Sequence, residues 1–190
     1  MTEPATFDQL AAVIRGRRTS MLVDPECEVP VALAQQLCEL ASWAPSHKRT
    51  WPWNFAMFTG DGRRRLGETM VADMVDAEFG DEGKRLKTAT KYLRTPAILV
   101  VGCEPHDNEL LHQENRDAVA AAIQNLLLGA TAIGLATFWS SPALPNAPRV
   151  LELCGFEPDD RIVGIIYLGW AERMSEAPQR PSIDLTVIDG

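Results

Sequence analysis

The chain has 190 residues, 46% of them apolar and 23% charged, and a formal net charge of −8. These values are typical of one globular domain over residues 1–190, and no run approaches the roughly 20 apolar residues that span a bilayer. The acidic balance repels a polyanion such as nucleic acid, and residues 1–4 show no secretory leader, so we expect a cytoplasmic protein without nucleic-acid or membrane partners.

Two helices are predicted in the first quarter of the chain. A capping-box pattern begins at Thr6, so a helix should follow it to about Arg15 and end at Gly16. Pro30 fits the first turn of a second helix, and Pro45 stops it. One face of that helix is apolar, with Leu33, Leu37, Leu40 and Ala41.

The next segment predicts a strand, two helices and a buried strand. Residues 54–59 alternate weakly, as in a strand. A third helix ends at Gly80, and a fourth, basic helix runs through Tyr92 and stops before Pro96. The third helix is marked by Leu66, Met70, Met74 and Val75. Residues 97–102 form a continuous apolar run, the pattern of a strand buried on both faces.

The longest predicted helix runs from about Glu114 to Ile133 and is apolar on nearly every side. Such a helix is buried on several sides, either centrally or against a partner subunit. Its main apolar face comprises Val119, Ala122, Ile123, Leu126, Leu127, Ala130 and Ile133. Gly134 ends it, and residues 135–139 predict another strand.

The last quarter of the chain predicts a short helix at residues 149–153, ended by Gly155, and a buried strand at 162–168. Residues 178–190 are expected to form an extended tail. Strands separated by helices indicate a mixed α/β or α+β domain. No candidate strand is followed by the glycine-rich turn of a Rossmann domain or by a Walker loop, so side chains must hold any nucleotide.

The four cysteines are far apart and form no C-x-x-C pair. In a chain without a leader they are most simply reduced, buried thiols, so neither a disulfide framework nor a zinc site is predicted. These residues are Cys27, Cys38, Cys103 and Cys154.

A basic segment follows the first helix. Arg17, Arg18 and Thr19 offer two guanidinium groups and a hydroxyl, which together can surround a phosphate. The alternative is a solvated basic helix end that complements the helix dipole, and spacing alone favours this alternative.

A second basic segment is a proline-bounded loop that holds His47, Lys48 and Arg49 together with Trp51 and Trp53. Charge beside aromatic planes suits a conjugated ring with polar edges. The alternative is that the tryptophans anchor the loop on the core while the charges face water. No second histidine or carboxylate is near enough in sequence to indicate a metal pair or a catalytic triad.

Trp139, Ser140 and Ser141 lie at the carboxyl end of a predicted strand, where α/β sheets often place ligands, although an ordinary strand exit explains them equally well. Arg180, in the tail, is by itself best explained as a surface residue. Three carboxylates are best explained as a solvated helix start: Glu109, Glu114 and Asp117.

Taken together and in order, these segments resemble the nitroreductase family of FMN-dependent oxidoreductases over nearly the whole chain. The resemblance rests on Arg17-Arg18-Thr19-Ser20, Ala44-Pro45-Ser46 running to Pro52-Trp53, Ala122-Ile123-Gln124-Asn125-Leu126-Leu127-Leu128 with Gly134-Leu135, Val163-Gly164 to Gly169, and Arg180. The His47-Lys48 variant is similar to a compact subgroup with short chains.

This resemblance implies an α+β fold with a central mixed sheet flanked by helices, in an intertwined homodimer with FMN at the subunit interface. It implies that Arg17, Arg18, Thr19 and Arg180 hold the FMN phosphate. It also implies that Pro45, Ser46, His47 and Trp51 reach the isoalloxazine and ribityl chain from the partner, and that Trp139, Ser140 and Ser141 line the ring. NADH or NADPH would be the hydride donor, and no catalytic nucleophile is needed.

The resemblance implies an NAD(P)H oxidoreductase that passes hydride by a ping-pong mechanism to a nitroaromatic, quinone or related acceptor. Three positions depart from the family pattern: Met21 replaces a cation near the flavin, and Arg49 and Trp51 stand where asparagine and glutamine are usual. Trp51 and Met21 favour an alternative, a flavin-sequestering or regulatory protein with little turnover. A third hypothesis is a reductase or dehydrogenase specialised for one metabolite.

Overall fold

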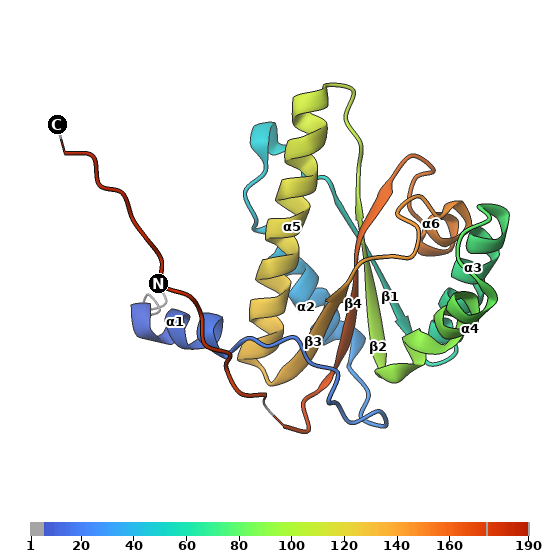
Figure 1. The fold of residues 1–190 in the computed structure, drawn as a ribbon, viewed down its shortest axis with the longest axis horizontal. Coiled ribbons are helices and arrows are strands. Elements are labelled where there is room, and N and C mark those ends of the chain that lie inside the picture. The colour runs from blue at the N-terminus through green and yellow to red at the C-terminus, as the bar shows by residue number, and fades with distance from the viewer. Residues whose placement is uncertain (1–5, 174, 190) are drawn as a thin grey trace.

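The computed structural model describes residues 6–173 and 175–189; residues 1–4, on which the expected lack of a leader rests, and Gly190 of the predicted tail lie outside these ranges. A four-stranded sheet forms the middle of the molecule, and helices cover both of its faces (Figure 1). This arrangement confirms the predicted α+β fold.

The sheet has the order β1-β2-β4-β3, with β1 at Trp53–Thr59, β2 at Ala97–Cys103, β4 at Arg161–Trp170 and β3 at Leu135–Ser140. All pairs of neighbouring strands are antiparallel, which differs from the expected mixed sheet. The one parallel pairing in the described residues is an isolated bridge from Thr19 to Thr137. Strand direction depends on the crossovers: β4 inserts between β2 and β3, and no local pattern encodes that insertion.

One face of the sheet is covered by α2, Val31–Ser42, and α5, Glu109–Ala132. Leu37 of α2 and Val119 and Ile123 of α5 are buried against β2 and β4. Every residue of β2 is buried, as its continuous apolar run predicts.

The opposite face is covered by α3, Gly62–Asp76, α4, Glu82–Lys91, and α6, Pro148–Cys154 (Figure 1). A second core joins Leu66, Met70 and Met74 of α3 to β2 and β4. The predicted helix stop at Gly155 is confirmed, because this residue caps α6 in the left-handed conformation, with φ of 71°.

The first helix, α1, spans Phe7–Gly16 and begins with the predicted capping box. The Gln9 amide donates to Thr6 Oγ1 at 3.2 Å, and the Thr6 amide donates to Gln9 Oε1 at 2.9 Å. At the other end of the chain, residues 175–189 form no helix or strand, and Figure 1 shows this tail passing α1 and leaving the body of the molecule.

Several predicted details are wrong. α5 starts five residues before Glu114, because the Asn108 side chain accepts from the Leu111 amide at 3.1 Å and caps the helix there. Pro30 is the N-cap of α2 and lies outside the first turn. Three residues assigned to apolar core faces have side chains at least two-fifths exposed: Leu40, Val75 and Ile133.

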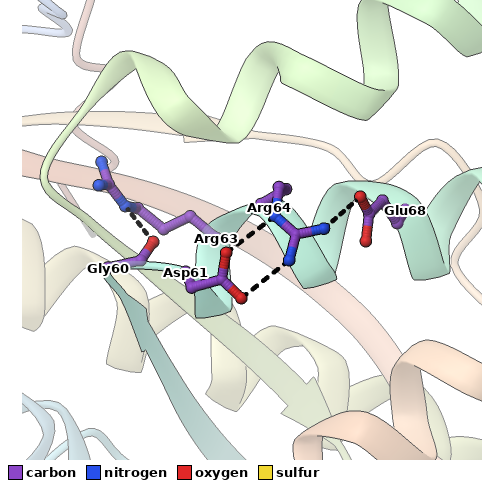
Figure 2. Close-up of polar contacts among 5 residues, drawn as sticks. All are labelled: Gly60, Asp61, Arg63, Arg64 and Glu68. Atoms are coloured by element: carbon purple, nitrogen blue, oxygen red, sulfur yellow. Dashed lines mark hydrogen bonds and ion pairs between the residues drawn. The ribbon is translucent and has the colours of Figure 1, made fainter.

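The start of α3 carries a charged surface cluster (Figure 2). The Arg64 guanidinium donates to Asp61 at 2.8 Å and to Glu68 at 2.5 Å, and these contacts place it along the first turns of the helix. The hydrogen bond from Arg64 lowers the pKa of Asp61. Exposed pairs of this kind contribute little to stability, so the cluster is a solvated face of α3.

All four cysteines are free, and only three of them are buried or half-buried: Cys27 is exposed, contrary to expectation, because it lies in a turn between β-bridge residues and α2. Burial raises the pKa of Cys38 and Cys103 to about 11 and that of Cys154 to about 12, so these thiols stay protonated at neutral pH. Over residues 6–173 and 175–189, no helix combines the length and apolar character needed to cross a membrane.

Candidate functional site

A cleft of about 560 Å³ lies where the end of α1, the middle of α5 and the tail meet. Its lining brings together three of the residues predicted to hold a phosphate. The lining residues are Ile14, Arg15, Arg17, Arg18, Gln124, Ala177, Pro178 and Arg180. A volume of this size is within the range of small-molecule sites, and four guanidinium groups at its wall favour an anion.

The two neighbouring arginines of the cleft have different roles. The Arg18 guanidinium donates to three backbone carbonyls, those of Arg15 at 2.6 Å, Arg17 at 2.7 Å and Glu176 at 3.2 Å. It therefore ties the tail to the end of α1 and keeps only part of its donor capacity for a ligand. Among the described residues, no partner is found for the Arg17 guanidinium, which leaves all of its donors available.

Beyond the arginines, the chain pairs with β3. Thr19 forms the bridge with Thr137, and the Ser20 amide donates to the Thr137 carbonyl at 2.9 Å. The Thr137 hydroxyl is buried and has no hydrogen-bond partner within the described part of the chain. This pairing places the arginine segment beside the strand that ends at Trp139 and Ser140.

The indole of Trp139, a residue of β3, packs over the neighbouring strand β4 at Gly164, which has no side chain. A Cβ added to Gly164 would be 2.6 Å from Trp139 Nε1 and 3.1 Å from Ile123 Cδ1. Gly164 therefore makes room for the indole plane, and Ile123, next to Gln124 in α5, packs beside it. Trp139 remains 38% exposed, so part of a flat aromatic surface faces outward.

The proline-bounded loop contains a 3₁₀ turn, η1, at His47–Arg49. Lys48, Arg49 and Trp51 have positive φ angles of 54°, 58° and 45°. For residues other than glycine, each such conformation costs about 1–2 kcal/mol, so the surrounding contacts must hold the loop in place. Strain of this kind concentrates at functional sites.

Two sets of contacts fix the loop on the first half of α5. His47 Nδ1 lies 2.5 Å from Glu114 Oε2. Thr50 Oγ1 donates to Asn115 Oδ1 at 2.7 Å, and Asn115 is only 3% exposed. The expectation that Glu114 belongs to a solvated helix start is therefore wrong: its partner is 67 positions away in the sequence.

The two tryptophans of the loop differ: one anchors the loop on the core, and the other leaves its ring available for a ligand. Trp53 is half-buried and packs against the core, as an anchor would, whereas Trp51 is 60% exposed. The side chains of Lys48 and Arg49 are also exposed. Trp51 and Trp53 line a second, shallow cavity of about 520 Å³ with Glu39, Ser42 and Trp43.

Within one chain, the predicted site residues form two separate groups. Arg17, Arg18 and Arg180 line the cleft with Gln124 of α5, and Thr19 joins this group to β3, the strand that ends at Trp139 and Ser140 and is followed by Ser141. Pro45, Ser46, His47 and Trp51 lie beside Glu114, ten residues earlier in the helix. Ten residues of α-helix correspond to about 15 Å, so one chain does not bring the two groups together.

Sequence reasoning did not assign roles to Thr50, Glu114, Asn115 and Gln124. Gln124 interrupts the apolar run of α5, and that interruption was an available signal, whereas residues 114 and 115 lie within the polar stretch 112–117 and carry no such signal. Their partners are distant in sequence, so the signal alone could not identify them.

Comparison with known proteins gives a consistent result. The model of the nitroreductase family matches residues 14–170. YdjA of Escherichia coli K12, which carries the name of an NAD(P)H nitroreductase, is 30% identical over 166 residues, covering 86% of this chain and 88% of that protein.

Two crystal structures are also similar. A nitroreductase-like family protein from Bacillus cereus has a TM-score of 0.82 and 30% identity, with all of both chains covered. A nitroreductase with bound FMN from Bacteroides fragilis has a TM-score of 0.76 and 21% identity, covering 95% of this chain and 99% of that one, and this likeness concerns the fold.

Proposed function

Since this chain belongs to the nitroreductase family, we propose that it is an FMN-dependent NAD(P)H oxidoreductase that passes hydride to a nitroaromatic, quinone or related acceptor. The observation that carries the proposal is the arginine cleft whose following residue, Thr19, pairs with β3, the strand that carries the partly exposed indole of Trp139. A phosphate and a conjugated ring are the two parts of FMN that those features suit.

The phosphate end of the cofactor fits the cleft between α1 and the tail. Arg17 would contact the phosphate directly, with Thr19 and Arg180 completing the set. Arg18 would contribute mainly by holding the tail, because its guanidinium already donates to three carbonyls. A charge-assisted hydrogen bond from Arg17 would be the strongest of these contacts.

The ring end fits the surface formed by Trp139, Ser140 and Ser141. When bound, FMN supplies the redox chemistry by accepting a hydride from NADH or NADPH and returning it to the acceptor. The protein positions the ring and excludes competing groups. Because donor and acceptor would use the same open face of the ring, one must leave before the other enters, which gives ping-pong kinetics.

A homodimer would complete the site, since the loop of residues 45–51 lies about 15 Å along α5 from the cleft of its own chain. The tail supports this arrangement, because Ile183, Leu185 and Val187 alternate with polar residues, Ile188 follows them, and all four apolar side chains are 75–92% exposed. β1 is an edge strand with an apolar groove of about 350 Å³ beside it, lined in part by Phe55 and Met57. A strand-like tail from a second copy fits this edge.

The test of the cofactor is direct. The purified protein should be yellow or become so with FMN, and FMN at 100 times its Kd should raise the free energy of unfolding by about 2.7 kcal/mol. Colourless protein that gains no stability from added FMN would refute the proposal. Parallel double-reciprocal plots for NAD(P)H and a quinone would support the ping-pong mechanism, and intersecting plots would contradict it.

Arg17→Ala should weaken FMN binding by about 1.5–3 kcal/mol, because it removes a charged hydrogen bond to the phosphate. Arg65→Ala is the matched control, since Arg65 is exposed on α3 on the other face of the sheet. Fluorescence titration with FMN measures both affinities. Equal affinity in the Arg17 variant and the wild type would remove Arg17 from the phosphate site.

Deletion of residues 182–190 tests the dimer and keeps Arg180. We expect the shortened chain to sediment as a monomer and to lose FMN affinity at the same protein concentration. A dimer that survives the deletion would show that the tail does not hold the subunits together.

The same measurements distinguish an oxidoreductase from the alternative, a flavin-storage protein with little turnover. Tight FMN binding without oxidation of NADH or NADPH in the presence of a quinone would favour it. Steady oxidation would exclude it, and turnover confined to one compound of an acceptor panel would favour a specialised reductase.

A further inference from the structure

The loop of residues 45–51 is held by a chain of hydrogen bonds that runs in one direction. The Trp51 amide donates to Ser46 Oγ at 3.0 Å. Ser46 Oγ and Thr50 Oγ1 lie 2.8 Å apart, and Thr50 Oγ1 lies 2.7 Å from Asn115 Oδ1. Asn115 Nδ2 donates to the backbone carbonyl of Glu104 at 3.2 Å.

The direction of each hydrogen bond follows from the last acceptor in the series, the Glu104 carbonyl. The Glu104 carbonyl can only accept, so the Asn115 amide must turn its NH₂ group toward it and its oxygen toward Thr50. That oxygen accepts only, which requires the Thr50 hydroxyl to donate its single proton to Asn115. Thr50 can then only accept from Ser46.

From this series of hydrogen bonds we infer that the Ser46 hydroxyl donates its only proton to Thr50. Toward a bound ligand, Ser46 can therefore act only as a hydrogen-bond acceptor. A hydroxyl oxygen has two lone pairs, and the Trp51 amide occupies one of them. The other remains for a group that donates. The inference rests on the proposed function for the identity of that ligand.

If the ligand is FMN, only its hydrogen-bond donors can pair with the Ser46 hydroxyl oxygen. The donors of FMN near its ring are the N3–H group and the ribityl hydroxyls, whereas the two ring carbonyls only accept. Ser46 of one subunit would therefore contact N3–H or a ribityl hydroxyl, and the carbonyls would need other donors. Thr50 and Asn115 act as positioning residues, because they set the orientation of the Ser46 hydroxyl without contacting the cofactor.

The arrangement also explains how the loop keeps its strained backbone. Lys48, Arg49 and Trp51 have left-handed conformations, and the hydrogen bonds of Ser46 and Thr50 connect both sides of that stretch to the buried Asn115. A hydroxyl at residue 50 is needed for this connection, since a side chain of the same shape without it would break the chain of bonds at its centre.

The first experiment measures the Kd of FMN analogues with wild-type protein and with Ser46→Ala. The donor-deficient probes are 3-methyl-FMN and the 2′-, 3′- and 4′-deoxyribityl analogues; the acceptor-deficient probes are 2-thio-FMN and 4-thio-FMN. One donor-deficient analogue should bind wild type at least fivefold more weakly than FMN and lose that difference in Ser46→Ala. For the thio analogues, the Kd relative to that of FMN should differ by no more than twofold between wild type and Ser46→Ala. Coupling of Ser46 to a thio analogue, or to no analogue, would overturn the inference.

The second experiment needs no cofactor. Thr50→Val should lower the urea midpoint of the apoprotein, and Thr50→Ser should restore it; the control is Thr90→Val, at an exposed threonine of α4. Thr50→Val should also abolish the analogue discrimination of Ser46, and Thr50→Ser should preserve it. Equal behaviour of Thr50→Val and Thr50→Ser would overturn the inference. If wild type fails to bind FMN at all, the proposed function fails, and the apoprotein comparison still decides the hydrogen-bond chain.

Discussion

Gly164→Ala should destabilise the protein through Trp139. The new Cβ would lie 2.6 Å from Trp139 Nε1 and 3.1 Å from its Cδ1, whereas carbon atoms in ordinary contact are about 3.5–4.0 Å apart. The indole must therefore move by about 1 Å or turn into solvent. Overpacking of this kind costs about 1–3 kcal/mol, and replacing a strand glycine by alanine returns about 0.5–1 kcal/mol. The two ranges leave a net loss of up to about 2.5 kcal/mol, and of about 1 kcal/mol at their midpoints.

A double-mutant cycle measures the contact itself. Urea unfolding gives the stability of wild type, Gly164→Ala, Trp139→Ala and the double variant. Of the three atoms nearest to the added Cβ, two belong to the indole and the third is the flexible end of Ile123, so without the indole the alanine at 164 should cost little. We expect a coupling free energy of about 1–2 kcal/mol, which exceeds the 0.3–0.5 kcal/mol of ordinary non-additivity. The same loss in both backgrounds would refute the view that Gly164 provides the space for Trp139.

The cofactor provides a second measurement. If the Trp139 indole lines the ring, Gly164→Ala should weaken FMN binding as well as lower stability. Gly102→Ala is the matched control, because Gly102 lies in β2 and its added Cβ would be 2.8 Å from the ring of Phe156, which is not among the residues that line the cleft. This control should lose stability and leave the Kd of FMN unchanged.

Two further predictions concern stability. Asp73→Ala should lower the free energy of unfolding by about 2–3 kcal/mol in urea, because this buried carboxylate accepts from the amides of Arg149 and Val150 and caps α6; a loss under 0.5 kcal/mol would contradict that role. Burial raises the pKa of Cys103 to about 11 from 9.0, so the unfolded chain releases this proton first as pH rises, and between pH 9 and 11 this thiol should lower stability by about 1.4 kcal/mol per pH unit, in addition to the contributions of Cys38 and Cys154. Between pH 8 and 10.5, the free energy of unfolding should fall less steeply with pH in Cys103→Ala than in wild type, and as steeply as in wild type in the exposed control Cys27→Ala. Equal pH slopes in all three proteins would argue against the linkage.

The elements were predictable from the sequence where local signals determine them. The capping box at Thr6, the glycine stop at Gly155 and the continuous apolar run of β2 each depend on residues within a few positions of one another. Sheet direction was not predictable, because it depends on where β4 inserts. The start of α5 was missed because its cap, Asn108, precedes the apolar pattern by a full turn or more.

The candidate site was predictable as a set of segments and not as a geometry. Arg17 and Arg180 were both selected in sequence, and the structure places them in one cleft. The contact of His47 with Glu114 and the place of Trp139 over Gly164 join residues from different elements. Only packing in three dimensions reveals such pairs, since neither residue of a pair carries a local sign of the other.

Exposed apolar side chains occur on several elements, and two groups of them, on α1 and in the tail, bear on the proposed dimer. On α1, Phe7, Leu10 and Ile14 form one stripe and are 79%, 53% and 49% exposed. The tail adds four exposed apolar side chains, and it passes the same cleft. Burying one such side chain contributes about 1.5–3 kcal/mol, so covering both surfaces would outweigh the cost of association. Ile14 of the α1 stripe also lines the arginine cleft, together with Ala177, Pro178 and Arg180 of the tail. If a second copy covers the stripe and the tail, cofactor binding and dimerisation would share contacts at the cleft, and a variant that weakens one should weaken the other.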